Sequence, residues 1–180
     1  MANHVDNIIE VFFNKEDQNA IDFLTQLYEI GTDGDLSSLY ENAENTRSWW
    51  EDNIGAKWAY VNDLDTPPEE GFFYINITSA WGPVIPLVEY ISESLNHKCR
   101  IEHRYIDEMP NFAGCRIIKD GEIVYDVSDE DMWTTLEEEK ELRMKSEDLH
   151  FDNEEEEEQW FWDWRWEYVH EFVDPDNFKE

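Results

Sequence analysis

The sequence predicts an α+β fold in which helices cover one face of an antiparallel sheet. Three observations support this prediction: a strand that leads directly into a helix within residues 71–95, the order of strands and helices along the chain, and a hairpin turn at Asp120-Gly121. A strand followed at once by a helix needs a sheet to pack on, because each element alone leaves an apolar face in water.

Residues 71–95 carry the clearest local pattern in the chain. Apolar and more polar side chains alternate along residues 73–78, which is the period of a half-buried strand. Pro83 then fits a first helical turn, where the N–H that proline lacks would have no helical partner. Apolar residues recur every fourth position after it and predict one buried helix face. The apolar strand residues are Phe73, Ile75 and Ile77, and the helix residues are Leu87, Ile91 and Leu95.

Four elements are predicted before this unit. Residues 6–13 alternate in polarity as a strand, and Asn14 is predicted to cap a helix that ends near Gly31. A second helix is predicted to stop at Gly55, because glycine suits a left-handed C-terminal cap. This second helix covers residues 41–54, and a short strand is predicted at 57–61. A loop with a short helical turn at 36–40 connects the two helices, and a proline-containing turn follows at 66–71.

Three strands are predicted after it, at 97–106, 111–119 and 122–127, the last two joined by Asp120-Gly121. Lys98, Arg100 and Arg104 are expected on the outer sheet face, where they neutralise nearby carboxylates. The resulting order is a ferredoxin-like β-α-β-β-α-β antiparallel sheet with an extra β-hairpin. We therefore expect a ferredoxin-like domain over residues 1–127 and an acidic, aromatic-rich C-terminal extension, residues 128–180, packed on the core.

The charge of the chain restricts its partners. Its 180 residues carry 45 acids against 13 Lys and Arg, a formal net charge of −32, yet 41% are hydrophobic and 15% aromatic. Such a chain can bury enough apolar surface to fold. Direct nucleic-acid binding is disfavoured, because Lys and Arg carry the affinity for phosphates. A basic protein partner is electrostatically favoured.

Several other classes of site find no support in the sequence. Cys99 and Cys115 are expected to be buried thiols, and His97 and His103 to be strand residues without a catalytic role. No catalytic residue, cofactor or metal ion is predicted. No apolar run spans a membrane and no secretory pattern precedes the first strand, so a cytoplasmic location is expected.

The extension concentrates the negative charge. Residues 128–180 hold 21 acids and 5 bases, a net −16 and half of the total. Residues 129–149 are predicted to be helical with Ser128 as the cap. In residues 160–169 aromatics fall on alternate positions, as in a strand, and also on every fourth position, as in a helix; the aromatic content favours a strand.

The candidate partner-binding residues all lie in this extension. Carboxylates would contact a basic surface, and exposed tryptophans would supply hot spots. The set is Glu137, Glu138, Glu139, Glu154, Glu155, Glu156, Glu157, Glu158, Trp160, Trp162 and Asp163. The run 154–158 is also read as a solvated charge run and not as a metal site.

Three segments resemble a known family. They are the N-terminal Asn3-His4-Val5-Asp6-Asn7 with its strand, the segment Asn53-Ile54-Gly55-Ala56-Lys57-Trp58, and the strand that ends in Thr78-Ser79-Ala80-Trp81-Gly82-Pro83. Together they are similar to the YubB-like ferredoxin-like domain of plasmid and phage proteins, over residues 1–127. The resemblance implies the same fold and supplies no catalytic residues.

Charge and resemblance together suggest a class of target. A folded protein whose carboxylates occupy a DNA-binding groove acts as a DNA mimic, since duplex DNA carries one negative charge per ~1.7 Å. For a mobile-element protein the expected target is a host nucleic-acid-binding defence protein, as in anti-restriction or anti-CRISPR inhibition. The alternative is a protein–protein interaction module that uses the tryptophan-rich segment, with the acidity serving solubility.

Overall fold

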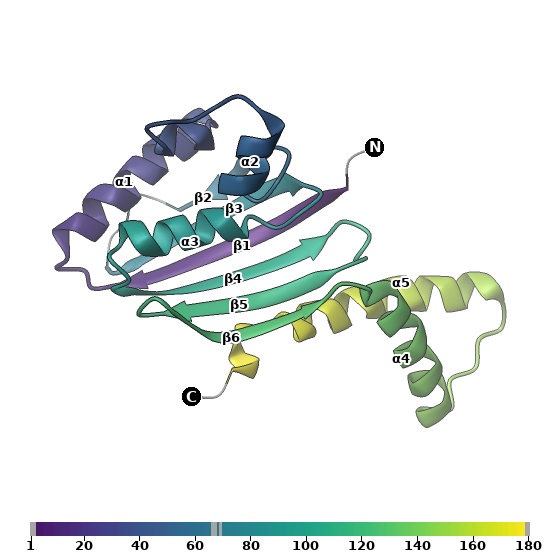
Figure 1. Cartoon of the computed structure of the whole chain (residues 1–180). Coiled ribbons are helices and arrows are strands. Elements are labelled where there is room, and N and C mark those ends of the chain that lie inside the picture. Colours follow the sequence, from purple (N-terminus) through teal and green to yellow (C-terminus); the bar gives the residue numbers. More distant parts are fainter. Residues whose placement is uncertain (1–2, 66–67, 69, 179–180) are drawn as a thin grey trace.

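The computed structural model describes residues 3–65, 68 and 70–178 and shows a six-stranded antiparallel sheet with helices (Figure 1). The predicted turn at 66–71 includes residues 66, 67 and 69, which lie outside the described part. The strands are β1 (His4–Phe13), β2 (Ala59–Leu64), β3 (Phe72–Ala80), β4 (Cys99–Asp107), β5 (Ala113–Lys119) and β6 (Glu122–Asp129). The helices are α1 (Gln18–Asp33), η1 (Leu36–Leu39), α2 (Arg47–Asn53), α3 (Ile85–Ser94), α4 (Met132–Ser146), α5 (Glu154–Phe172) and η2 (Pro175–Asn177).

The strand order confirms the predicted fold class. The sheet runs β2-β3-β1-β4-β5-β6, and β1 pairs antiparallel with both β3 and β4. The first four strands in this order are the ferredoxin-like core. The hairpin β5–β6 extends the sheet beyond β4, with Asp120 and Gly121 at its turn in positive φ (51° and 82°), as expected for a tight hairpin turn.

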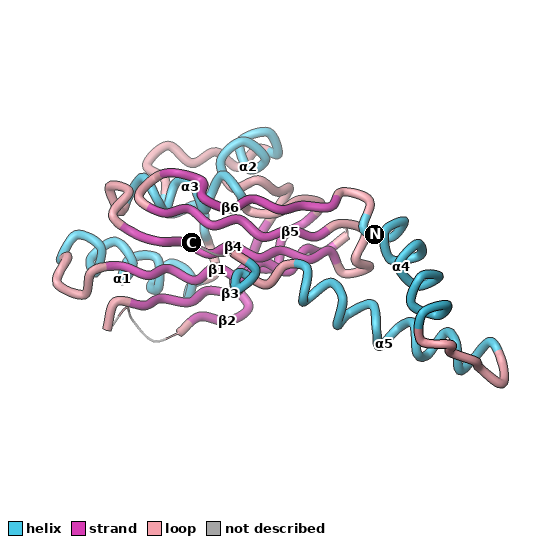
Figure 2. Tube along the Cα trace, turned by 90° about the horizontal axis from the view of Figure 1, so that it is seen from below, coloured by secondary structure: helices cyan, strands magenta, loops and turns pink. Residues whose placement is uncertain are grey.

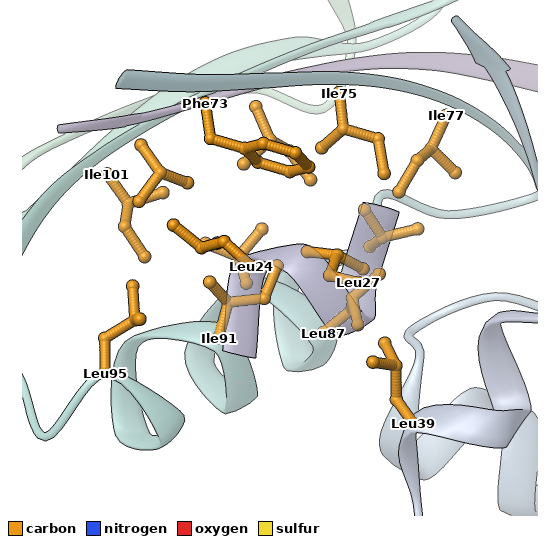
Figure 3. Close-up of a cluster of buried hydrophobic side chains, with 14 of the residues drawn as sticks. Leu24, Leu27, Leu39, Phe73, Ile75, Ile77, Leu87, Ile91, Leu95 and Ile101 are labelled. Carbon is orange, nitrogen blue, oxygen red and sulfur yellow. The ribbon is translucent and has the colours of Figure 1, made fainter. Parts of the chain in front are cut away.

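The main core lies between the sheet and the helices α1 and α3. Odd-numbered residues of β1 and β3 face these helices, and Leu24 and Leu27 of α1 meet Leu87 and Ile91 of α3 beneath them (Figure 3). All four leucine and isoleucine side chains are fully buried. Burying each such side chain stabilises the fold by ~1.5–3 kcal/mol, so this cluster fixes the strand register.

A second, smaller core lies on the opposite face of the sheet. There Cys115 and Ile117 of β5 pack with Val169 and Val173 near the end of α5. The C-terminal segment thus lies on the side of the sheet opposite α3 (Figure 2), and Phe178 packs against Tyr125 with ring centroids 5.7 Å apart. This packing attaches the end of α5 to the sheet.

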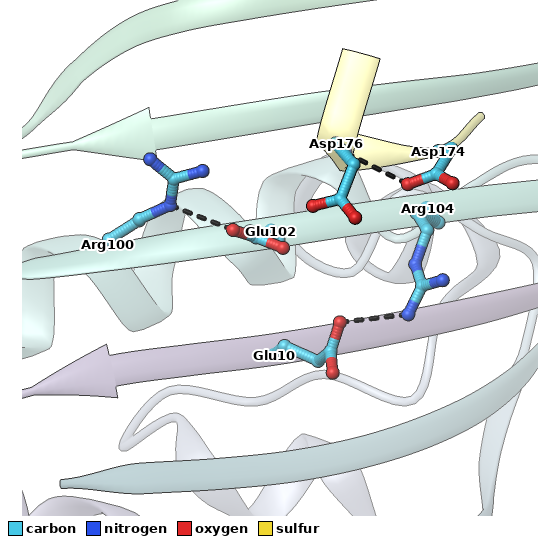
Figure 4. A network of polar contacts seen from close by, with 6 residues as sticks. All are labelled: Glu10, Arg100, Glu102, Arg104, Asp174 and Asp176. Atoms are coloured by element: carbon cyan, nitrogen blue, oxygen red, sulfur yellow. Dashed lines mark hydrogen bonds and ion pairs between the residues drawn. The ribbon is translucent and has the colours of Figure 1, made fainter. Parts of the chain in front are cut away.

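Ion pairs cover the rest of that face near β4. Arg100 Nε lies 2.8 Å from Glu102 Oε1, and Arg104 Nη2 lies 2.8 Å from Glu10 Oε2 (Figure 4). The prediction that Arg100 and Arg104 neutralise carboxylates of the outer face is therefore confirmed. Such partly exposed pairs contribute ~0–1 kcal/mol each.

Several predicted boundaries were wrong by a few residues. Asp17, not Asn14, caps α1, because its carboxylate accepts the Asn19 and Ala20 N–H groups. Likewise Thr46 caps α2 by accepting the Trp49 N–H, so that helix starts at residue 47 and not at 41. Ser128 belongs to β6, and α4 begins after Asp131. Each of the two caps satisfies N–H groups that a helix leaves free at its start.

Candidate interaction surface

The predicted partner-binding residues lie on a helical hairpin formed by α4 and α5. The hairpin projects beyond the end of the sheet, and α5 then returns along the sheet's far face (Figures 1 and 2). We call α4, residues 147–153 and the part of α5 up to Asp163 the acidic hairpin. Its two helices are joined by an ion pair of 2.7 Å between Lys140 Nζ and Glu157 Oε1.

The strand favoured for residues 160–169 is wrong, because these residues form the middle of α5. The Asn153 side chain accepts the Glu156 N–H at 3.0 Å and so caps the helix. Four glutamates in the first turn interact favourably with the positive end of the helix dipole. Helical spacing also stacks Trp160 on Trp164, with centroids 5.7 Å apart and planes 6° from parallel.

The aromatic residues of α5 divide between interior and surface. Phe161 and Trp164 are buried, and Trp160 is half-buried. Trp162, by contrast, is 44% exposed, and Trp133 of α4 is 37% exposed. Of the two tryptophans predicted to contact a partner, Trp162 is therefore the better placed.

Most of the predicted carboxylates are exposed. Glu137 and Glu138 on α4 and most of the run 154–158 face solvent, whereas Glu139 is partly buried and Glu157 is the partner of Lys140. Asp163 is exposed and accepts hydrogen bonds from Gln159 Nε2 at 3.1 and 3.2 Å. The structure thus gathers the predicted acids on one projecting element.

Helical geometry adds two acids that sequence reasoning missed. Glu156, Asp163, Glu167 and Glu171 are separated by seven, four and four residues, so they share one face of α5, and all four are exposed. We call these four residues the acidic stripe. Glu167 and Glu171 were missed because a strand at 160–169 gave no reason to join them to the glutamate run. Their spacing of four residues was the available sequence pattern.

The charge density of α5 resembles that of nucleic acid. The helix spans 19 residues, or ~28 Å at 1.5 Å per residue, and its sequence contains eight carboxylates. This is one carboxylate per ~3.5 Å, close to the ~3.4 Å axial spacing of phosphates along one strand of B-DNA. The match is in average density, since five of the eight acids are consecutive at the start of the helix.

Arg165 is the unusual cation of α5. Its side chain is fully buried, stacks against Trp162, and has Trp166 and Trp133 at 5.5 and 5.8 Å. Within the described part of the chain, none of its three side-chain nitrogens has a hydrogen-bond partner. Burial lowers the pKa of Arg165 from its ordinary value. A buried guanidinium without an acceptor is costly, so its stacking on the rings is its main compensation.

The three segments that carry the resemblance meet at the start of α3. Gly55, at φ 99°, lies so close to the next segment that an added Cβ would be 2.5 Å from the Pro83 carbonyl oxygen. The Trp81 N–H donates to the Asn3 carbonyl at 3.0 Å, and the Ala80 N–H donates to that of Trp58 at 3.0 Å. We call this place the motif junction.

Trp81 presents its ring at the surface of the motif junction. It is 45% exposed and has a positive φ of 72°, which is strained for a residue with a Cβ. Lys57 Nζ and Arg47 Cζ lie 4.5 and 4.8 Å from the centre of its ring. These distances are those of cation–π contacts, so the ring already binds positive charge.

A buried polar network supports the junction from within the sheet. The Asn7 Nδ2 donates to Ser79 Oγ at 2.9 Å, and Asn7 Oδ1 lies 3.1 Å from His103 Nε2. All three side chains are fully buried. Burial and the charge of Arg116 lower the pKa of His103 to about 3, which keeps the imidazole neutral.

The cysteines are free, buried thiols, as predicted. Burial raises the pKa of Cys99 to about 11 and that of Cys115 to about 12. They lie on opposite faces of the sheet, because Cys99 faces the main core whereas Cys115 belongs to the second core. Among the described residues, no helix is long and apolar enough to cross a membrane, and no three His, Cys, Asp or Glu side chains gather as metal ligands.

Comparisons with known proteins give one family. A comparison with curated proteins and one with solved structures found no match. A family model described as the ferredoxin-like domain in Api92-like protein matches residues 58–163. The predicted ferredoxin-like character is confirmed, although the matched region starts at β2 and includes the acidic hairpin, whereas the resemblance was placed at 1–127. The chain therefore belongs to the family of ferredoxin-like domains found in Api92-like proteins.

Proposed function

We propose that this chain is a non-catalytic inhibitor that binds a basic, nucleic-acid-binding protein of host defence through the acidic hairpin and the acidic stripe. The observation that carries the proposal is the charge of α5, which places one carboxylate per ~3.5 Å on an exposed, projecting helix. A groove built to bind phosphates presents Lys and Arg, which carboxylates on such a helix would contact. Membership of the Api92-like family suggests a protein of the anti-immunity type, which agrees with such a target.

The fold supports this role by holding the charges apart from the rest of the molecule. At a net charge of −32, like charges repel and disfavour compact structure. The hairpin is nevertheless held together by the Lys140–Glu157 pair and by its buried aromatic residues. Its carboxylates are thereby fixed on a helical frame, which reduces the entropy lost when a partner binds.

The test compares two matched triple variants. E154Q/E155Q/E158Q removes three exposed charges from the acidic hairpin, and E16Q/E29Q/D33N removes three exposed charges in and beside α1. Proteins from a bacterial lysate are captured on the immobilised wild-type chain, identified and purified. Binding of the purified partner to all three chains is then measured, with a salt series and with duplex DNA as competitor.

We expect the wild-type chain and the α1 variant to bind alike and the hairpin variant to bind at least tenfold more weakly. Added DNA should displace the partner, and affinity should fall as salt rises, because both effects follow from shared electrostatic contacts. Equal binding by the two variants, or binding that neither DNA nor salt weakens, would contradict the proposal.

An interaction module based on aromatic contacts is the second candidate. It is supported by the exposure of Trp162 and Trp133, whose rings both lie near the Arg165 guanidinium. Tryptophan and arginine are enriched among hot spots. In this case W133A/W162A would abolish binding of the partner, the hairpin variant would retain it, and salt would have little effect.

A further inference from the structure

A cavity of about 330 Å³ opens beside the motif junction. Its walls come from three places in the sequence that the fold brings together: the segment between β3 and the start of α3, the adjoining ends of β4 and β5, and the end of β6. Aromatic rings form much of the wall and two carboxylates lie at the end of β6. The lining residues are Trp81, Pro83, Ile85, Tyr105, Phe112, Ala113, Ser128, Asp129 and Glu130.

The sheet is built to hold the Tyr105 ring in this wall. Tyr105 pairs with Gly114 across the β4–β5 ladder, and a Cβ on Gly114 would overlap the Tyr105 ring. The absence of a side chain at position 114 therefore lets the ring lie flat over β5. Trp81 supplies another wall from a strained backbone position, at φ 72°. Strain of ~1–3 kcal/mol persists only where surrounding structure holds it, and it concentrates at functional sites.

The charges around the cavity are negative. Asp129 is fixed, because its carboxylate accepts the Asp131 N–H at 2.9 Å and the Thr135 hydroxyl at 2.6 Å. Glu130 is exposed. No lysine or arginine is among the lining residues, and the two cations on the Trp81 ring, Lys57 and Arg47, are not part of the wall. The cavity thus combines aromatic faces with carboxylates, and its own lining residues include no cation.

We propose that this cavity receives an arginine side chain of the partner protein. A guanidinium group is flat, stacks on aromatic rings, and pairs with carboxylates through its planar set of N–H donors. It is also more weakly hydrated than the ammonium group of lysine, so it enters an aromatic pocket at a lower desolvation cost. The charge of the cavity and its aromatic wall both favour this occupant.

The position of the cavity connects it with the acidic hairpin. The Thr135–Asp129 hydrogen bond joins the cavity rim to the first turns of α4, and the hairpin leaves the sheet at the same end (Figure 1). A basic protein lying on the hairpin therefore reaches the cavity as well. The identity of the occupant as a partner residue rests on the proposed function, whereas the affinity of the cavity for a guanidinium group does not.

The test uses small blocked amino acids as probes. N-acetyl-arginine N-methylamide is titrated into the full chain, and the backbone amide and indole N–H resonances are followed by NMR. The corresponding citrulline compound has nearly the same shape without the charge, and the lysine compound has the charge without the planar group. E130Q removes the exposed carboxylate at the rim, and E122Q removes an exposed carboxylate at the other end of β6 as a control.

We expect arginine to shift the resonances of Trp81, Tyr105 and Ser128, with citrulline binding at least tenfold more weakly and lysine in between. E130Q should weaken arginine binding about three- to tenfold and E122Q should not change it. S128Y, at an exposed position of the rim, should block the cavity without disturbing the core. Equal binding of citrulline, or shifts confined to the hairpin and unaffected by E130Q and S128Y, would overturn the inference.

The outcomes for cavity and hairpin are separable. If arginine binds as expected but the hairpin variant still binds the partner normally, the cavity stands and the proposed function fails. If the hairpin variant loses the partner while S128Y and E130Q leave arginine binding unchanged, the proposed function stands and the cavity assignment fails.

Discussion

Asn7 Oδ1 accepts a hydrogen bond from the backbone N–H of Val84, 3.0 Å away and 77 residues later in the chain. Val84 is the N-cap residue of α3, and no side chain of its own segment caps that helix. A residue of the central strand thus provides the cap. Because the two N–H groups of Asn7 Nδ2 also lie within hydrogen-bond distance of Ser79 Oγ, the Ile77 carbonyl and the Val5 carbonyl, one carboxamide joins β1, β3 and α3.

Replacing Asn7 should therefore destabilise the whole domain. Asn7→Ala leaves the Val84 N–H and the His103 ring without their shared acceptor, and we expect the free energy of unfolding to fall by ~2–4 kcal/mol. Urea unfolding followed by circular dichroism measures this loss. Asn76→Ala on the outer face of β3 serves as the control; a loss at Asn7 no larger than at Asn76 would show that the network contributes little.

His103 should make the fold sensitive to acid. Its pKa is about 3 in the folded chain and 6.5 ordinarily, so between these values the unfolded chain binds the additional proton. Stability from this residue is complete above pH 6.5 and is lost as the pH falls toward 3. The loss is ~2 kcal/mol at pH 5, from 1.36 kcal/mol per pH unit below 6.5.

The measurement compares wild-type chain with His103→Gln, which does not titrate. Both unfolding free energies are determined at pH 7.5 and pH 5, so that the titration of the many carboxylates cancels in the difference. The wild-type chain should lose ~2 kcal/mol more than the variant. An identical pH dependence would mean that His103 becomes charged in the folded chain.

Trp81 offers a test of backbone strain. Both Trp81→Ala and Trp81→Gly remove the ring contacted by Lys57 and Arg47, but only glycine relieves the positive φ of 72°. The glycine variant should therefore be more stable than the alanine variant by ~1 kcal/mol, contrary to the usual order of these residues. Thermal unfolding of the two variants decides the sign.

Arg165 should limit the stability of the chain. Arg165→Met keeps the length of the side chain and removes a buried charge whose nitrogens lack acceptors. We expect the free energy of unfolding to rise by ~1–3 kcal/mol, because the relief of desolvation exceeds the lost stacking on Trp162. A lower stability of the methionine variant would show that the cation–π contacts dominate.

The fold was predictable because local patterns and long-range packing agree in residues 1–127. Phe73, Ile75 and Ile77 alternate along β3, and Leu87 and Ile91 are four residues apart on α3. Both patterns place the apolar face of their element in the same core. Helix starts were less predictable. Asn14, Asp17 and Thr46 are all residues that cap helices, and only the three-dimensional hydrogen bonds distinguish those that do.

The extension shows where a single sequence is ambiguous. The aromatic residues Trp160, Trp162, Trp164 and Trp166 fit the period of a strand and that of a helix. The structure has a helix, which is capped by Asn153, seven residues before Trp160. The carboxylates of the candidate surface could be identified by composition, but the acidic stripe could not, because it exists only on a helix. The division of the chain at residue 128 stays a prediction.

The contact of Gly55 with Pro83 also provides a criterion for comparing sequences. Residues 55 and 83 are far apart in sequence, yet the space between them excludes a Cβ at position 55. In any related chain that keeps Trp-Gly-Pro after β3, the position equivalent to 55 should be glycine, because the clash is with a backbone oxygen that every residue at position 83 carries. An alignment of such chains would show whether glycine is retained at this position.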